Sequence, residues 1–142
     1  MSAPVTFRRI LCAVDFSRDS LEAFHAAADM ARLRSGFLHV LHVIETQPPG
    51  SGEAIIELTK KANAALAELI ASAPSNGLAL SSEVSSGDTA IEIVDRAKDW
   101  RADLIVLGAR GVILIEDAIV GGTAEAVTRD APCSVLVVRQ RN

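Results

Sequence analysis

The stretch Asp103-Leu-Ile-Val-Leu-Gly108 decides the fold, because it holds four consecutive large apolar residues between an acid and a glycine. A run this short and this apolar is typical of a strand buried on both faces of a sheet. Upstream of it, Gly87-Asp88-Thr89 opens a segment that we expect to be a helix. The residues of this segment predicted to face the core are Ile91, Val94 and Ala97. A helix followed by a doubly buried strand favours a parallel sheet.

The same alternation recurs outward from this stretch in both directions. Strands are predicted at 10–14, 37–44, 78–85 and 134–138, and helices at 18–34, from Ile55 to Ile70, and at 123–129. We expect Gly36 to end the first helix. The second helix carries an apolar stripe formed by Ile55, Leu58, Ala62, Leu66, Leu69 and Ile70. Five alternations with short connections predict an α/β fold, an open parallel sheet with helices on both faces.

The composition limits the number of domains and the kinds of partner. A chain of 142 residues with 49% hydrophobic content fits one domain, residues 1–142, and its low aromatic content of 4% predicts a core of Ala, Val, Ile and Leu. The net charge of −4 provides no basic field to attract nucleic acid or an anionic membrane. The apolar run at 10–14 is too short for a signal peptide, so we expect a cytoplasmic protein in which Cys12 and Cys133 stay reduced.

A ligand is expected at the carboxyl ends of the strands, where the strand order of such a sheet reverses. Two segments should meet there: Ala13 to Ser17 and the glycine-rich segment 108–123. Glycines before a helix allow backbone N–H groups to approach an anion closely, but the same glycines could serve only as turns. Neither the dinucleotide-binding nor the P-loop glycine pattern is present.

Four motifs together resemble the universal stress protein family over nearly the whole chain. They are Val14-Asp15-Phe16-Ser17, Leu41-His42-Val43, Asp103-Leu-Ile-Val-Leu-Gly108 and Ala131-Pro-Cys-Ser-Val-Leu-Val-Val138. The resemblance implies a flavodoxin-like (Rossmann-like) five-stranded parallel sheet in the order 3-2-1-4-5. It also implies a homodimer that acts in stress adaptation. Many members of the family bind ATP or AMP, and others bind no nucleotide.

The resemblance also identifies candidate ligand residues. Nucleotide-binding members carry Gly, two residues, Gly, nine residues, Gly and then Ser or Thr. Gly108, Gly111 and Gly121 match this motif, whereas Gly122 stands in place of the hydroxyl residue and Thr123 follows one position later. Asp15 and Val43 match positions that the family uses around adenine and ribose, although Asp15 could instead cap a helix and Val43 could be a core residue. The candidate binding residues are therefore Ala13, Asp15, Val43, Gly108, Arg110, Gly111, Gly121, Gly122 and Thr123.

The interior of the glycine-rich segment leaves two functions open. It carries Val112 to Ile115 and then Glu116-Asp117, acids that would repel a triphosphate unless a cation such as Mg²⁺ bridges them. Only Arg110 offers positive charge nearby. The chain is therefore a regulatory module that binds ATP or AMP at a degenerate site, or a nucleotide-free module whose loop Val112 to Ile115 covers the pocket or docks a partner.

Neither a catalytic group nor a metal site is predicted. His39 and His42 should lie on opposite faces of one strand, so a single metal ion could not readily take both. We therefore expect a protein that is not an enzyme; slow ATP hydrolysis stays open, but the sequence identifies no general base for it.

The last strand, Ser134 to Val138, should be an edge of the sheet, because only four residues follow it. An apolar edge invites pairing with another chain. The resemblance implies that the homodimer forms by antiparallel pairing of this strand across a two-fold axis.

Overall fold

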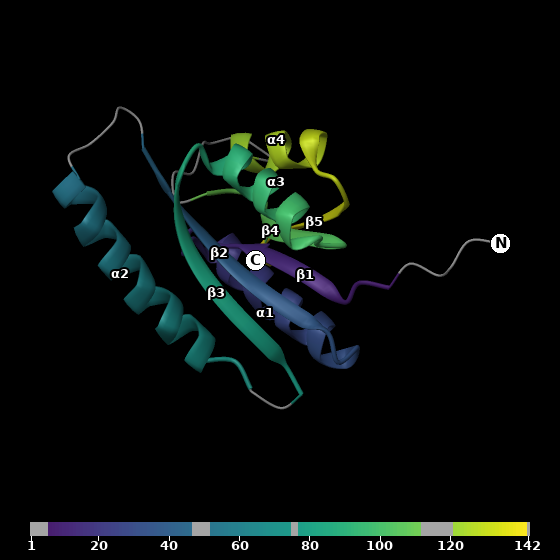
Figure 1. Ribbon diagram of the computed structural model, residues 1–142. Helices are drawn as coiled ribbons and strands as arrows, with labels where there is room; N and C mark the ends of the chain where they lie inside the picture. Colours follow the sequence, from purple (N-terminus) through teal and green to yellow (C-terminus); the bar gives the residue numbers. More distant parts are fainter. Residues whose placement is uncertain (1–5, 47–51, 75–76, 112–120, 142) are drawn as a thin grey trace.

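The computed structural model describes residues 6–46, 52–74, 77–111 and 121–141. All the strands described are parallel and form one sheet in the order β3-β2-β1-β4-β5, which confirms the predicted topology. Strands and helices alternate along the chain (Figure 1). Their bounds are β1 Arg9–Ala13, α1 Arg18–Leu33, β2 Phe37–Glu45, α2 Gly52–Ala71, β3 Ala79–Gly87, α3 Thr89–Trp100, β4 Leu104–Gly108, α4 Gly122–Asp130 and β5 Ser134–Val138.

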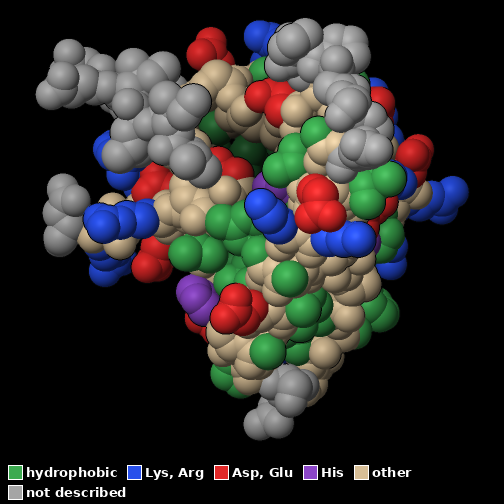
Figure 2. All heavy atoms as spheres, turned by 90° about the vertical axis from the view of Figure 1, so that its left-hand side faces the viewer, with side chains coloured by type: hydrophobic (Ala, Val, Ile, Leu, Met, Phe, Trp, Pro, Cys, Tyr) green, Lys and Arg blue, Asp and Glu red, His purple; other side chains and the backbone are tan. Residues whose placement is uncertain are grey.

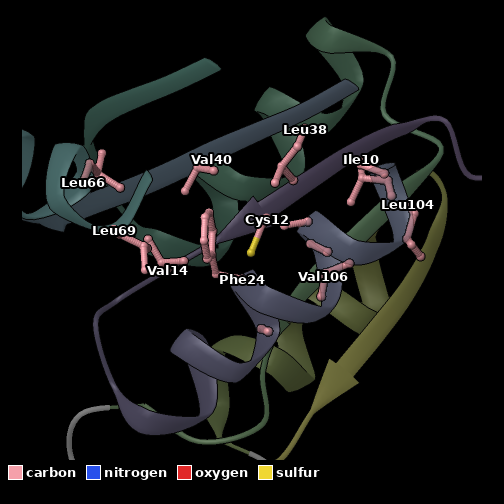
Figure 3. Packing of buried hydrophobic residues seen from close by; sticks show 14 residues of the cluster. Ile10, Cys12, Val14, Phe24, Leu38, Val40, Leu66, Leu69, Leu104 and Val106 are labelled. Carbon is pink, nitrogen blue, oxygen red and sulfur yellow. The ribbon is translucent and has the colours of Figure 1, made fainter. Parts of the chain in front are cut away.

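One hydrophobic cluster fills the space between the sheet and the pair α1 and α2. Alternate strand residues point to this face because side chains in a strand switch sides at every step. Phe24 of α1 is fully buried, and Figure 3 shows its ring and the Cys12 sulfur pointing toward one another. Other buried members are Ile10, Val14, Leu38, Val40, Leu66, Leu69, Leu104 and Val106.

A second cluster lies on the opposite face, under α3 and α4 (Figure 1). Its strand residues are the alternate set, so β1 contributes to both clusters and is buried on both sides. The buried members are Leu11, Ala13, Leu41, Val43, Ile93, Ala97, Ile105, Leu107, Ala124 and Val127. Small and branched side chains make up most of both clusters, as the low aromatic content predicted.

Two residues expected in the helical stripes are exposed. Ile91 of α3 is 58% exposed, and Ile93 takes its place against the sheet. Leu58 of α2 is 48% exposed because α2 packs on the cluster with its second half, through residues such as Leu66 and Leu69. Helical spacing identifies a face, but the length over which the sheet covers that face depends on tertiary packing.

The residue that turns the chain after α1 differs from the one predicted. Ser35, not Gly36, adopts the left-handed conformation after α1, with a φ of 48°. Gly36 is required for a close approach instead, since a Cβ atom there would lie 2.5 Å from the carbonyl oxygen of Arg8. The glycine therefore allows the start of β2 to pass beside the start of β1.

The two edges of the sheet differ in polarity. β5, at one edge, is Ser134-Val-Leu-Val-Val138, and Leu136 is 37% exposed. β3, at the other edge, carries four serines and a glutamate, Glu83. His39 of β2 links to this strand through Ser81 Oγ, 2.7 Å from its Nδ1, and Glu83 Oε1, 2.8 Å from its Nε2. No helix within the described ranges combines the length and hydrophobicity needed to cross a bilayer.

Candidate functional site

A pocket of about 370 Å³ opens where the strand order reverses, between the carboxyl ends of β1 and β4. Figure 2 looks onto the side of the molecule that carries α2 and these strand ends, and the surface there is hollowed, with hydrophobic side chains in its depth. All nine candidate residues line this one pocket: Ala13, Asp15, Val43, Gly108, Arg110, Gly111, Gly121, Gly122 and Thr123. Parallel strands therefore bring together residues that are up to 110 positions apart in the sequence, from Ala13 to Thr123.

The floor of the pocket is apolar. Leu41 and Val43 come from β2, Leu107 from β4 and Ile93 from α3, and each of them is buried in the cluster on that face. Ala13 ends β1, and its small side chain leaves space above the sheet. Val43 thus belongs to the core and also lines the pocket. An apolar floor of this kind suits an aromatic ring.

The turn after β1 holds Asp15 at the pocket. Phe16 adopts a φ of 65°, in the left-handed region that side chains rarely occupy, and so reverses the chain toward α1. Ser17 then caps α1, accepting a hydrogen bond from Ser20 N at 3.3 Å. Asp15 is not the cap. Its Oδ1 accepts a hydrogen bond from Ser17 N at 3.0 Å, which fixes the orientation of the carboxylate.

His42 supports this strained turn. Its Nδ1 donates a hydrogen bond to the carbonyl oxygen of Val14 at 2.7 Å, and its ring lies 4.9 Å from the Phe16 ring. Backbone strain at a single residue persists only where the surrounding structure fixes it. The histidine, for which the sequence suggested no role, therefore positions the loop that carries Asp15. His39 lies against Trp100 of α3, on the other face of the strand, as predicted.

The glycines of the motif have different roles. A Cβ atom on Gly108 would lie 2.7 Å from Ser20 N and 2.8 Å from the Asp19 carbonyl carbon, so this glycine lets β4 approach the start of α1. A Cβ atom on Gly111 would lie 3.1 Å from Asp15 Oδ2. Gly122 is different, because a Cβ atom there would meet nothing within 4 Å. Gly108 is thus needed for packing against backbone, a side chain at Gly111 would require only the Asp15 carboxylate to shift slightly, and Gly122 has room for a side chain.

Helix α4 begins at the pocket, and its first-turn amides have no hydrogen-bond partner among the residues that the structure describes. Gly121 is its N-cap, and no side chain caps it. The amide of Gly121 itself donates to the Ala109 carbonyl oxygen at 2.6 Å. The amides of the first turn, beginning at Gly122 and Thr123, have no partner inside a helix, and the helix dipole adds partial positive charge there. This end of the pocket can therefore accept an anion.

Arg110 is held by a residue that the sequence did not suggest. Its Nε and Nη2 donate to the two carboxylate oxygens of Asp19, at 3.0 and 3.2 Å. Asp19 is only 3% exposed and also accepts hydrogen bonds from Arg110 N and Gln140 N. The Arg110 guanidinium holds the pKa of the Asp19 carboxyl below its usual range. Arg110 therefore lines the pocket with its positive charge already paired.

Among the described residues, two further acidic groups line the pocket. One is Asp15, and the other is Glu45, which ends β2 and accepts a hydrogen bond from Thr89 Oγ1 at 3.2 Å. Within the described ranges, no three His, Cys, Asp or Glu side chains are grouped so that they could hold a metal ion. The segments Val112 to Ile115 and Glu116-Asp117 lie outside the described residues.

The family model described as "Universal stress protein family" matches residues 6–139. The chain belongs to the universal stress protein family. A universal stress protein of Synechocystis sp. is 31% identical, with 94% of this chain and 87% of that protein covered. The solved universal stress protein UspA from Lactobacillus plantarum is 29% identical, with a TM-score of 0.75 and coverage of 94% of this chain and 98% of that one.

Two other solved universal stress proteins carry bound nucleotides. One, from Archaeoglobus fulgidus, is a complex with dAMP; it is 24% identical, with a TM-score of 0.67 and coverage of 94% and 98% of the two chains. The other is a complex with cAMP; it is 21% identical, with a TM-score of 0.65 and coverage of 94% and 97%. At these identities the likeness shows the shared fold, and the ligands are properties of those two proteins.

The sequence missed three residues around the pocket: Asp19, His42 as a support of the turn, and Glu45. The fragment Ser17-Arg-Asp19 carried a detectable signal for Asp19, because an acid in the first turn of a helix interacts favourably with the helix dipole. Its pairing with Arg110 could not be read from the sequence, since the two residues are 91 positions apart.

Proposed function

We propose that this universal stress protein binds an adenine nucleotide, ATP or AMP, in the pocket between β1 and β4, and acts as a regulatory module in the stress response. The observation that carries the proposal is that all nine candidate residues line one pocket with an apolar floor and an uncapped helix start. Complexes of two proteins of the same fold with dAMP and cAMP lend support.

In this proposal the adenine lies on the floor made by Val43 and Leu107. Asp15 Oδ2, beside Gly111, accepts a hydrogen bond from the base or the ribose. The phosphate takes the free amides at the start of α4, where Thr123 also offers its hydroxyl. The protein binds the nucleotide but does not hydrolyse it catalytically. We place this function in the cytoplasm.

Isothermal titration of the protein with AMP tests the proposal, with GMP as a ligand of equal charge. Binding of AMP at micromolar Kd is expected, and at a hundredfold excess over Kd it should add about 2.7 kcal/mol to the free energy of unfolding. Asp15→Asn should weaken AMP binding about tenfold or more, because the free carboxylate oxygen is lost. Asp29→Asn, on the exposed face of α1, is the matched control and should leave binding unchanged.

The alternative is a nucleotide-free interaction module in which residues 112–115 cover the pocket or dock a partner protein. It is favoured by the paired state of Arg110 and by Gly122 in the place of a hydroxyl residue. No heat released on titration and no thermal stabilisation at millimolar AMP or ATP with Mg²⁺ would support this alternative and contradict the nucleotide site. Release of inorganic phosphate from ATP at steady turnover would contradict the assignment as a binding module.

We also propose that two copies pair through β5. This strand is a sheet edge with a partly exposed leucine, Leu136, and unpaired edges of this kind favour strand addition. Leu136→Glu should convert the dimer to monomer in light-scattering measurements. Ile56→Glu, at an exposed site on α2, is the matched control and should stay dimeric. A Leu136→Glu protein that keeps the dimer mass would contradict the interface.

A further inference from the structure

Asp19 is a buried carboxylate whose two oxygens are both fully engaged. Oδ2 accepts hydrogen bonds from Arg110 N at 3.1 Å and Arg110 Nε at 3.0 Å. Oδ1 accepts from Arg110 Nη2 at 3.2 Å and from Gln140 N at 2.9 Å. Three of the four donors thus belong to a residue that lines the pocket. A planar guanidinium held on two oxygens is restricted in both position and charge.

Arg110 is consequently a poor ligand for phosphate. Asp19 occupies two of the five guanidinium N–H donors, at Nε and Nη2, so a phosphate could contact the remaining donors only as the second anion on a guanidinium whose charge is already neutralised. Freeing the guanidinium completely would leave the carboxylate of Asp19, which is only 3% exposed, without its partner. A buried charge without its partner is strongly unfavourable. Among the described residues that line the pocket, Arg110 is the only lysine or arginine.

The surroundings of the α4 N-terminus also disfavour additional phosphates. The pocket continues into a groove between α3 and α4, with which it shares Glu45, Gly122 and Thr123. Asp88 and Asp95 of α3 line this groove together with Glu45. Its basic residues are Lys98, near the end of α3, and Arg129, which pairs with Asp130 at 3.2 Å. A phosphate chain that extended from the start of α4 into this groove would meet the carboxylates of Glu45, Asp88 and Asp95 as well as the ammonium group of Lys98.

We propose that Asp19 is a specificity-determining residue, which makes the pocket select adenosine monophosphates over adenosine triphosphates by holding the Arg110 guanidinium. A monophosphate can be satisfied by the amides at the start of α4, which need no cationic side chain. A triphosphate carries more charge and gains more from an unpaired cationic side chain, whereas Asp19 neutralises Arg110, the one cation among the described residues that line the pocket. This inference rests on the proposed nucleotide site.

The test compares the Kd values of AMP and ATP by isothermal titration in buffer with EDTA. The wild-type protein should bind AMP at least tenfold more tightly than ATP. Asp19→Asn should shift the ratio of the two Kd values at least tenfold toward ATP, because the guanidinium is released. In Asp19→Asn/Arg110→Gln, which has no cation to release, the ratio should return to within threefold of the wild type. Asp29→Asn on the same helix is the matched control for the loss of an acid.

An unchanged ratio in Asp19→Asn would overturn the inference and leave the nucleotide site standing. A wild-type protein that binds neither nucleotide would overturn both. If Asp19→Asn does not fold, NMR of the wild-type protein decides. The Nε–H resonance of Arg110 should keep its position on saturation with AMP, and a displaced resonance would show that the guanidinium leaves Asp19 and would overturn the inference.

Discussion

Replacing Gly122 by Ser should strengthen AMP binding, because it supplies the hydroxyl that the resemblance to the family motif implies for this position. The structure offers room for the change. A Cβ atom at Gly122 meets nothing within 4 Å, and the residue is the first of α4, where the backbone needs no glycine. A serine hydroxyl there would stand beside the free amides that we assign to the phosphate.

The expected gain follows from the value of one hydrogen bond to a charged group. Such a bond contributes about 1 to 2 kcal/mol net, which corresponds to roughly a five- to thirtyfold lower Kd. The free energy of unfolding should change by less than about 0.5 kcal/mol, since nothing is displaced and a first-turn serine is well tolerated. Isothermal titration with AMP measures the first quantity, and urea unfolding measures the second.

Gly122→Ala is the control for this experiment, because it stiffens the start of the helix equally but adds no hydroxyl. The reasoning is refuted if Gly122→Ser and Gly122→Ala bind AMP equally well. A second variant, Thr123→Val, tests whether the Thr123 hydroxyl contributes to AMP binding. If the Thr123 hydroxyl already contacts the phosphate, this variant should bind AMP about tenfold more weakly, and the gain from Gly122→Ser should then be small.

Three further predictions concern stability. Gly108→Ala should lower the free energy of unfolding by about 2 to 3 kcal/mol in urea titrations, because its Cβ atom would lie 2.7 Å from a backbone nitrogen of α1. If Gly108→Ala loses no more stability than Gly122→Ala, the close approach at Gly108 is contradicted. Ser17→Ala should cost about 1 kcal/mol through the lost helix cap, and an unchanged thermal midpoint would argue against that role. Because the folded pKa of Asp19 is lowered below 3.8, the unfolded chain binds its proton first as the pH falls. The stabilisation by Asp19 should therefore be complete above about pH 5 and be lost as the pH falls through the pKa of Asp19 in the folded protein. The urea midpoints of the wild type and Asp19→Asn should accordingly converge at low pH. A difference between the two midpoints that does not change with pH would refute this pH dependence.

The strands could be predicted because nearly every one is a short apolar run. Leu104 to Leu107 are all buried in β4, and a strand buried on both faces has no polar positions to confuse the pattern. The helices were harder to place against the sheet. Ile91 and Leu58 follow helical spacing but lie beyond the area that the sheet covers, which the spacing alone does not reveal.

The residues of the pocket could be predicted, but not how the pocket is held together. The resemblance to the family motif points to positions such as Gly108 and Gly111, whereas their roles depend on which atoms lie opposite them. Gly108 faces the start of α1, and Gly111 faces Asp15. The pairing of Asp19 with Arg110 is a contact between distant segments, and no periodicity in the sequence encodes such a contact.

The unequal polarity of the two sheet edges has a consequence for assembly size. A sheet whose two edge strands can both pair with another molecule can add copies at each edge and form a filament. Here β5 offers an apolar strand, whereas Ser81 and Glu83 of β3 are held by His39 in a polar row. Polar and charged edge residues discourage strand addition. If β5 pairs with its own copy across a two-fold axis, the apolar edge of each molecule is buried in the interface, and the assembly remains a dimer.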